Sequence, residues 1–212
     1  MMVEVLRDYS LLLIDDVPHE VYIMALILFC TGSILSFGLK EWQKGFRFSM
    51  ALLLLEYVLL LYGSTVFFRE TMVGRQYDFT PFWSYSEERL IPENIMNVVV
   101  FVPIGFLTGT QIKAKQKSQI MQKDLSSENH QTCLLGRVAR FFSERKWGWL
   151  AVILVGAAIS FGIETLQFIF KKGFAEFDDI FHNTLGCVIG YGLYVIIKTG
   201  YERISKRSLA IL

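Results

Sequence analysis

The chain contains five apolar segments, and each of them approaches the length that crosses a lipid bilayer. Spanning the hydrocarbon core takes about 20 predominantly apolar residues in a helix. The composition agrees, because 53% of the 212 residues are hydrophobic and the mean hydropathy is +0.41. The sequence therefore predicts an all-α fold, a polytopic membrane helix bundle that forms a single domain over 1–212. The five expected helices cover 21–39, 47–68, 94–112, 147–170 and 181–198.

Charged residues divide unequally between the two sets of connections that such a bundle creates. Segments 40–47, 113–146 and 198–212 hold 15 Lys and Arg against 5 Asp and Glu, whereas the N-terminus, 69–93 and 171–180 hold 6 against 13. Basic connections stay in the cytoplasm. We therefore expect the N-terminus outside, the C-terminus inside and 113–146 as a cytoplasmic loop. This loop should contain a flexible section and then a short interfacial helix.

The start of the fifth helix carries polar residues into the membrane. They occur in the stretch EFDDIFHNTLG, and their spacing of three and four residues places them on one helix face. The same face continues into a GxxxG pair, which allows another backbone to approach closely. Asp179 and Asn183 should therefore face other helices, with Glu176 and Asp178 at the rim. The stripe comprises Asp179, His182, Asn183, Gly186 and Gly190.

Other helices offer polar residues at a comparable depth. The fourth helix has Ser160, Glu164 and Gln167 on one face, and the third has Asn97. Pro103 and Gly105 should kink the third helix near mid-membrane. A buried carboxylate needs a partner, and Arg69 at the end of the second helix is the predicted one, with Lys171 or Lys172 as substitutes.

Two interpretations of this cluster remain open. Amides inside a membrane often only hold helices together, which would make the cluster a structural network. Charges in a bilayer are costly unless they are paired or solvated. Several carboxylates, amides and an arginine at one depth therefore favour a binding site in a polar cavity open to the outside. Glu56 is separate from the cluster, and it is either a packing residue or a proton site.

Five short motifs together resemble the VanZ-like family over about 65–198. They are TVFFR ending at Arg69, TPFWSY at 80–85, NVVVFVPIG at 97–105, ETLQ at 164–167 and FDDIFHNTLG at 177–186. The resemblance implies a multi-pass protein of a bacterial plasma membrane, related to a protein linked to resistance against teicoplanin-type lipoglycopeptide antibiotics. Many members carry an arginine shortly before the acidic pair, where this chain has Gly173 preceded by two lysines.

The first functional hypothesis is a non-enzymatic protein that limits the access of a lipoglycopeptide to the cell surface. Its expected partners are membrane lipids, the antibiotic or a lipid-linked cell-wall precursor, and not nucleic acid. The binding residues expected in the outer cavity are Arg69, Asn97, Glu164, Gln167, Asp178, Asp179, His182 and Asn183. Pro103, Gly105, Gly186 and Gly190 are expected to be structural.

Two alternatives use the same residues differently. In a membrane enzyme acting on a lipid-linked substrate, Glu164 and Asp179 would divide the acid and base roles, or would hold a divalent metal with His182. In a small proton-coupled transporter, Glu56 and Glu164 would carry the proton. No catalytic residue is assigned. No cofactor is expected, and the three cysteines form no CxxC pair that would support a thiolate metal site.

Overall fold

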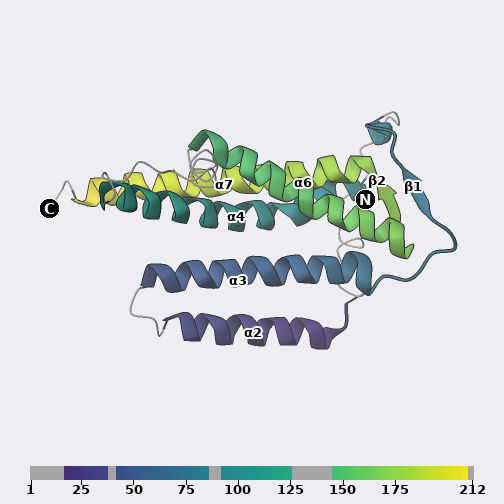
Figure 1. Cartoon of the computed structure of the whole chain (residues 1–212), viewed down its shortest axis with the longest axis horizontal. Coiled ribbons are helices and arrows are strands. Elements are labelled where there is room, and N and C mark those ends of the chain that lie inside the picture. Colours follow the sequence, from purple (N-terminus) through teal and green to yellow (C-terminus); the bar gives the residue numbers. More distant parts are fainter. Residues whose placement is uncertain (1–16, 38–41, 86–91, 126–144, 210–212) are drawn as a thin grey trace.

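The computed structural model describes residues 17–37, 42–85, 92–125 and 145–209, and it is a bundle of long helices (Figure 1). The all-α fold is therefore confirmed. Short elements lie between the helices: the π-helical turn η1 (Gly63–Phe67), the strand β1 (Gln76–Asp78), the 3-10 turn η2 (Trp83–Tyr85) and the strand β2 (Phe174–Glu176). The helices are α2 (His19–Phe37), α3 (Trp42–Tyr62), α4 (Pro92–Leu125), α6 (Arg145–Phe170) and α7 (Phe177–Leu209).

Four segments within the described residues are long and apolar enough to cross a membrane. They are Lys44–Phe67, Pro92–Ile112, Trp147–Phe170 and Phe177–Tyr201, and each agrees with one of the expected spans. The apolar part of α2 covers His19–Ile34 and is shorter than these four.

Two helices continue well beyond their expected ends. The section that starts at Lys113, which we expected to be flexible, is helical as far as Leu125. It is rich in Lys and Gln, which are good helix formers, and this explains the correction. Likewise, α7 begins at Phe177 and reaches Leu209. The predicted interfacial helix near residue 140 lies outside the described residues.

The helices alternate in direction, so one side of the bundle holds the last residues of some helices and the first residues of the others (Figure 1). We call this side the strand end, because β1 and β2 lie there. α3 and α6 finish at the strand end, while α4 and α7 begin there and run side by side in the same direction. The two strands pair in parallel, with Tyr77 opposite Ala175. The sequence analysis did not predict this ladder.

Three glycines allow α4 and α7 to lie unusually close together. A Cβ atom at Gly186 would meet the Val98 carbonyl oxygen, and one at Gly190 would meet that of Val102. From the other helix, Gly105 faces the Cys187 carbonyl. The close contact expected from the GxxxG spacing is thus made with α4, and it fixes the positions of the polar residues in the first turns of both helices.

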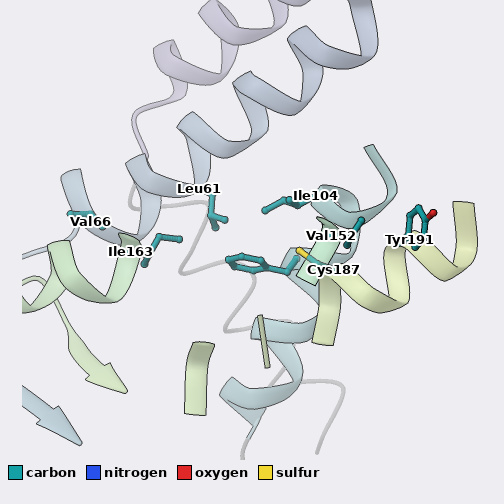
Figure 2. Packing of buried hydrophobic residues seen from close by; sticks show 8 residues of the cluster. Leu61, Val66, Ile104, Val152, Ile163, Cys187 and Tyr191 are labelled. Atoms are coloured by element: carbon teal, nitrogen blue, oxygen red, sulfur yellow. The ribbon is translucent and has the colours of Figure 1, made fainter. Parts of the chain in front are cut away.

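The buried apolar core lies between α3, α4, α6 and α7 (Figure 2). No residue of α2 belongs to it among the described residues, and the side chains of α2 that are exposed include Ile23, Leu26 and Ile34. The four-helix part alone therefore forms the frame for the polar residues. The core cluster comprises Leu61, Val66, Phe101, Ile104, Val152, Ile163, Cys187 and Tyr191.

Candidate functional site

Polar side chains from α4, α6 and α7 come together at the strand end. Asn97 of α4 donates a hydrogen bond from Nδ2 to Oδ1 of Asp179 in the first turn of α7, at 2.7 Å. One turn deeper, Asn183 Nδ2 donates to Ser160 Oγ of α6 at 2.8 Å. The structure thus links all three helices through residues of the predicted stripes.

Glu164 is buried and reaches the connection between α6 and α7. Its Oε2 accepts a hydrogen bond from the backbone N–H of Glu176 at 3.0 Å. Glu176 is the last residue of β2, so the short strand carries its N–H to the carboxylate. A buried carboxylate that accepts a backbone N–H is held in one position, as a binding or catalytic group requires.

Asp178 differs from its predicted position at the rim, because its exposed fraction is 0%. Its Oδ1 accepts a hydrogen bond from the backbone N–H of Phe82 at 2.6 Å. The segment 79–85 folds over α7, and helical spacing alone contains no information about such a cover. Phe82 takes a left-handed backbone conformation, with φ of 60°, which is uncommon for a bulky residue.

His182 is buried and is the second attachment of the same segment. Its Nε2 lies 2.8 Å from the hydroxyl oxygen of Tyr85, and the two rings are stacked with their centroids 5.7 Å apart. We name residues 80–85 the aromatic turn. It is joined to α7 by one bond to Asp178 and one to His182.

Gln167 connects α6 to the end of α3. Its Nε2 donates to the carbonyl oxygen of Thr65 at 3.1 Å, within the π-helical turn η1. Turns of this kind are frequent at functional sites because they alter the normal hydrogen bonding of the helix. Here η1 offers a carbonyl oxygen to the Gln167 side chain.

Arg69 is exposed, and its guanidinium lies beside Gly173 and the Gln167 amide. It is close enough to act electrostatically on Glu164 and Asp179. However, it forms no ion pair with either carboxylate within the described residues, so the predicted direct pairing is not observed. Lys172 donates from Nζ to the Arg69 carbonyl oxygen at 2.6 Å, which holds the two connections together.

Glu176 lies outside the membrane spans, and its surroundings raise the pKa of its carboxyl group to about 7. Burial is the main cause, and the neighbouring charges of Asp179, Asp178 and Asp78 add to it. The Trp83 side chain acts in the opposite direction by favouring the charged form. The charge of Glu176 therefore changes near neutral pH.

The remaining predicted residues lie apart from this cluster. α4 is a single helix through Pro103, and Gly105 packs against α7. Glu56 is buried in α3, and no described residue forms a hydrogen bond with its Oε1. The described part of the chain contains no group of three His, Cys, Asp or Glu side chains placed to hold a metal ion, so the metal alternative for Glu164, Asp179 and His182 finds no support there.

The sequence analysis did not predict that residues of the aromatic turn contact individual residues of the polar cluster. Phe82, Trp83 and Tyr85 each lie against a different acidic or histidine residue of the cluster. The available signal was the motif TPFWSY, but the sequence does not indicate which partners it contacts.

Comparison with known proteins identifies a family for this chain. Residues 21–198 match the model of the family described as VanZ/LLP1. No curated protein and no solved structure matches the chain. The matched range includes the aromatic turn, the polar cluster and all or most of each of the five helices. The chain therefore belongs to the VanZ/LLP1 family and is a membrane protein of the VanZ type.

Proposed function

We propose that this chain lowers the susceptibility of a bacterial cell to teicoplanin-type lipoglycopeptides without breaking a covalent bond. The strand end would face the outside of the plasma membrane, as the charge distribution predicts. There the polar cluster would form an outward-facing cavity that holds a lipid headgroup or a lipid-linked cell-wall precursor. The aromatic turn would contact the acyl tail of the antibiotic.

The observation that carries this proposal is the pairing of exposed aromatic rings with buried polar groups. Phe82 and Tyr85 are 50% and 52% exposed, yet each is fastened to a buried residue of α7. Aromatic residues are favoured at the membrane interface, where one side is apolar and the other is wet. Such a turn can contact an acyl chain while the cluster beneath it contacts a headgroup.

Drug susceptibility tests this proposal. Wild type, Asp179→Asn and Asp78→Asn would be expressed at matched membrane levels in a sensitive Gram-positive host, and growth inhibition by teicoplanin and vancomycin would be compared. Asp78 is a suitable control because it lies in the same region, where the described residue that donates to its side chain is Thr80, through its N–H at 2.8 Å, a bond that an Asn can also accept.

We expect wild type and Asp78→Asn to protect selectively against teicoplanin and Asp179→Asn to protect much less. Equal protection by all three proteins would remove Asp179 from the site. If none of the three protects, the proposed resistance function is wrong.

An enzyme acting on a lipid-linked substrate is the second candidate. It is favoured by one feature, namely that Glu164 and Asp179 lie on facing helices and are each held by a single hydrogen bond. Two carboxylates in different surroundings can divide the acid and base roles. Lipid extracts from cells with wild type and with Glu164→Gln would differ in the amount of substrate, whereas identical lipid profiles would exclude this activity.

A further inference from the structure

Several hydrogen-bond acceptors at the strand end have no donor among the described residues. Glu164 uses Oε2 to accept the Glu176 N–H, and Asp179 uses Oδ1 to accept from Asn97. Each carboxylate is therefore fixed through one oxygen. No hydrogen-bond donor within the described residues reaches the second oxygen of either group.

Two buried amides repeat this pattern. Gln167 and Asn183 are only 5% and 4% exposed, and both use their nitrogen as a donor, to the Thr65 carbonyl and to Ser160. Their oxygen atoms, Gln167 Oε1 and Asn183 Oδ1, are buried, and no described residue donates to them. Leaving a buried acceptor unpaired is unfavourable. A ligand that carries hydrogen-bond donors would pair these oxygens, which no described residue does.

The amides share helix faces with the carboxylates. Gln167 follows Glu164 by three residues on α6, and Asn183 follows Asp179 by four on α7, so each pair lies on one face. The bond from Asn183 to Ser160 joins the two faces. The four acceptor groups thus lie near the strand end of α6 and α7, where Glu164 and Asp179 are close enough to act on each other, and we call these four residues the acceptor layer.

The charges near this layer are mostly negative. Asp178 and Glu176 add to the negative charge around Asp179, while Arg69 is the cation that acts on Glu164 and Asp179 and forms no ion pair with either in the described part of the chain. Aromatic rings attract cations through their faces. The aromatic turn lies against the acidic residues through the Phe82 N–H at Asp178 and the Trp83 side chain at Glu176.

We propose that the acceptor layer binds a primary ammonium group, carried either by a lipid headgroup or by a free amine. This inference rests on the proposed function and names the chemistry of its ligand. An ammonium group carries one positive charge and three N–H donors, so it can donate to as many as three of the acceptors in this layer at once. A quaternary ammonium has the charge without the donors, and a neutral polyol has the donors without the charge.

Native mass spectrometry of the purified full chain can test this choice. The lipid-depleted protein in detergent micelles would receive equal amounts of phosphatidylethanolamine, phosphatidylcholine and phosphatidylglycerol with identical acyl chains. We expect phosphatidylethanolamine to be retained about tenfold more than the other two, which corresponds to about 1.4 kcal/mol. Equal retention of phosphatidylethanolamine and phosphatidylcholine would overturn the proposal, as would a preference for phosphatidylglycerol.

Soluble phosphoethanolamine distinguishes the two sources of the amine. If it displaces the lipid, the headgroup alone is sufficient and a free amine also fits the site. If it does not displace the bound lipid, the ligand is the lipid. Both results retain the ammonium group as the feature that is recognised.

Three variants test whether the preference for phosphatidylethanolamine depends on the acceptor layer. Glu164→Gln replaces a carboxyl group of the layer with an amide and Gln167→Met removes an unpaired acceptor, so both should lose the preference for phosphatidylethanolamine. Glu70→Gln is the control, because Glu70 is exposed at the strand end and lies outside the layer. Melting temperatures show which variants are folded. If either folded variant, Glu164→Gln or Gln167→Met, still prefers phosphatidylethanolamine, the amine binds outside the acceptor layer and the proposal is wrong.

The two proposals can fail separately, because this assay contains no antibiotic. Protection against teicoplanin without a preference for the amine would leave the resistance function standing and remove the ammonium site. A preference for the amine without protection would retain the ammonium site and remove the resistance function.

Discussion

The pair α4–α7 and the pair α2–α3 are both neighbouring helices in one bundle, but they are held together differently. α4 and α7 touch backbone to backbone at Gly186 and Gly190, and Asn97 binds Asp179 above these contacts. In α2–α3, Gly32 faces the end of the flexible Leu52 side chain. The comparison teaches that rigid packing is concentrated where the polar cluster must be positioned, while α2 covers α3 with adaptable apolar side chains.

The largest difference in stability between the helix pairs α4–α7 and α2–α3 should appear when an alanine replaces one glycine in each pair. Gly190→Ala would push against the Val102 carbonyl and the Phe106 backbone, which cannot move without displacing α4. Overpacking of this kind costs about 3 kcal/mol, or roughly 10 °C in melting temperature for a chain of this size. Gly32→Ala should change the melting temperature by far less. Equal losses in detergent-solubilised protein would show that the two pairs are equally rigid.

The next largest effect tests whether Asp178 of α7 holds the aromatic turn in place. Asp178→Ala leaves the Phe82 N–H without its acceptor, which should cost about 2 kcal/mol locally. Hydrogen exchange should become faster across residues 79–85. The control Asp78→Ala removes the exposed bond to Thr80 N–H and one of the charges near Glu176, neither of which involves Phe82, so exchange should accelerate at Thr80 and not at Phe82. Unchanged protection of Phe82 in Asp178→Ala would disprove the attachment.

A smaller effect should appear as a dependence of stability on pH. The pKa of Glu176 is raised from 4.5 to about 7 in the folded chain, so the folded state binds the proton more tightly than the unfolded state. The contribution of Glu176 to the free energy of unfolding is then largest below pH 4.5. It falls as the pH rises towards 7 and levels off above it. Melting temperatures between pH 5 and 8 should show this decline. Glu176→Gln should flatten it and Glu70→Gln should not, whereas an unchanged slope in Glu176→Gln would contradict the assignment.

The smallest effect concerns the hydroxyl group of Tyr85. Tyr85→Phe removes the bond to His182 but retains the stacked ring, so the loss should be about 1 kcal/mol. The matched control is Tyr77→Phe, because Tyr77 stacks on Phe79 with centroids 5.2 Å apart. Exchange at residues 83–85 should respond to the first variant and not to the second. The same response to both would mean that ring stacking alone holds the turn.

The sequence predicted the helices well because apolar length and charge asymmetry are properties of continuous segments. It placed Asp179 and Asn183 on one face because helical spacing is regular. Asp178 was placed wrongly, since its burial depends on Phe82, which is 96 residues away. β1 and β2 were missed because three-residue strands carry no periodic pattern, and their pairing joins two distant connections.

The site interpretation and both proposals depend on the strand end facing outward, and labelling of introduced cysteines tests this directly. Val73 is fully exposed in the connection that contains β1, and Ser205 lies near the other end of α7, beyond the span that ends at Tyr201. Val73→Cys and Ser205→Cys would be treated in intact cells with a membrane-impermeant maleimide, and labelling would be compared with that of wild type, which has its own three cysteines. We predict that Val73→Cys is labelled in intact cells and that Ser205→Cys is labelled only after permeabilisation. The reverse result would place the polar cluster on the cytoplasmic side and would contradict the outward-facing site.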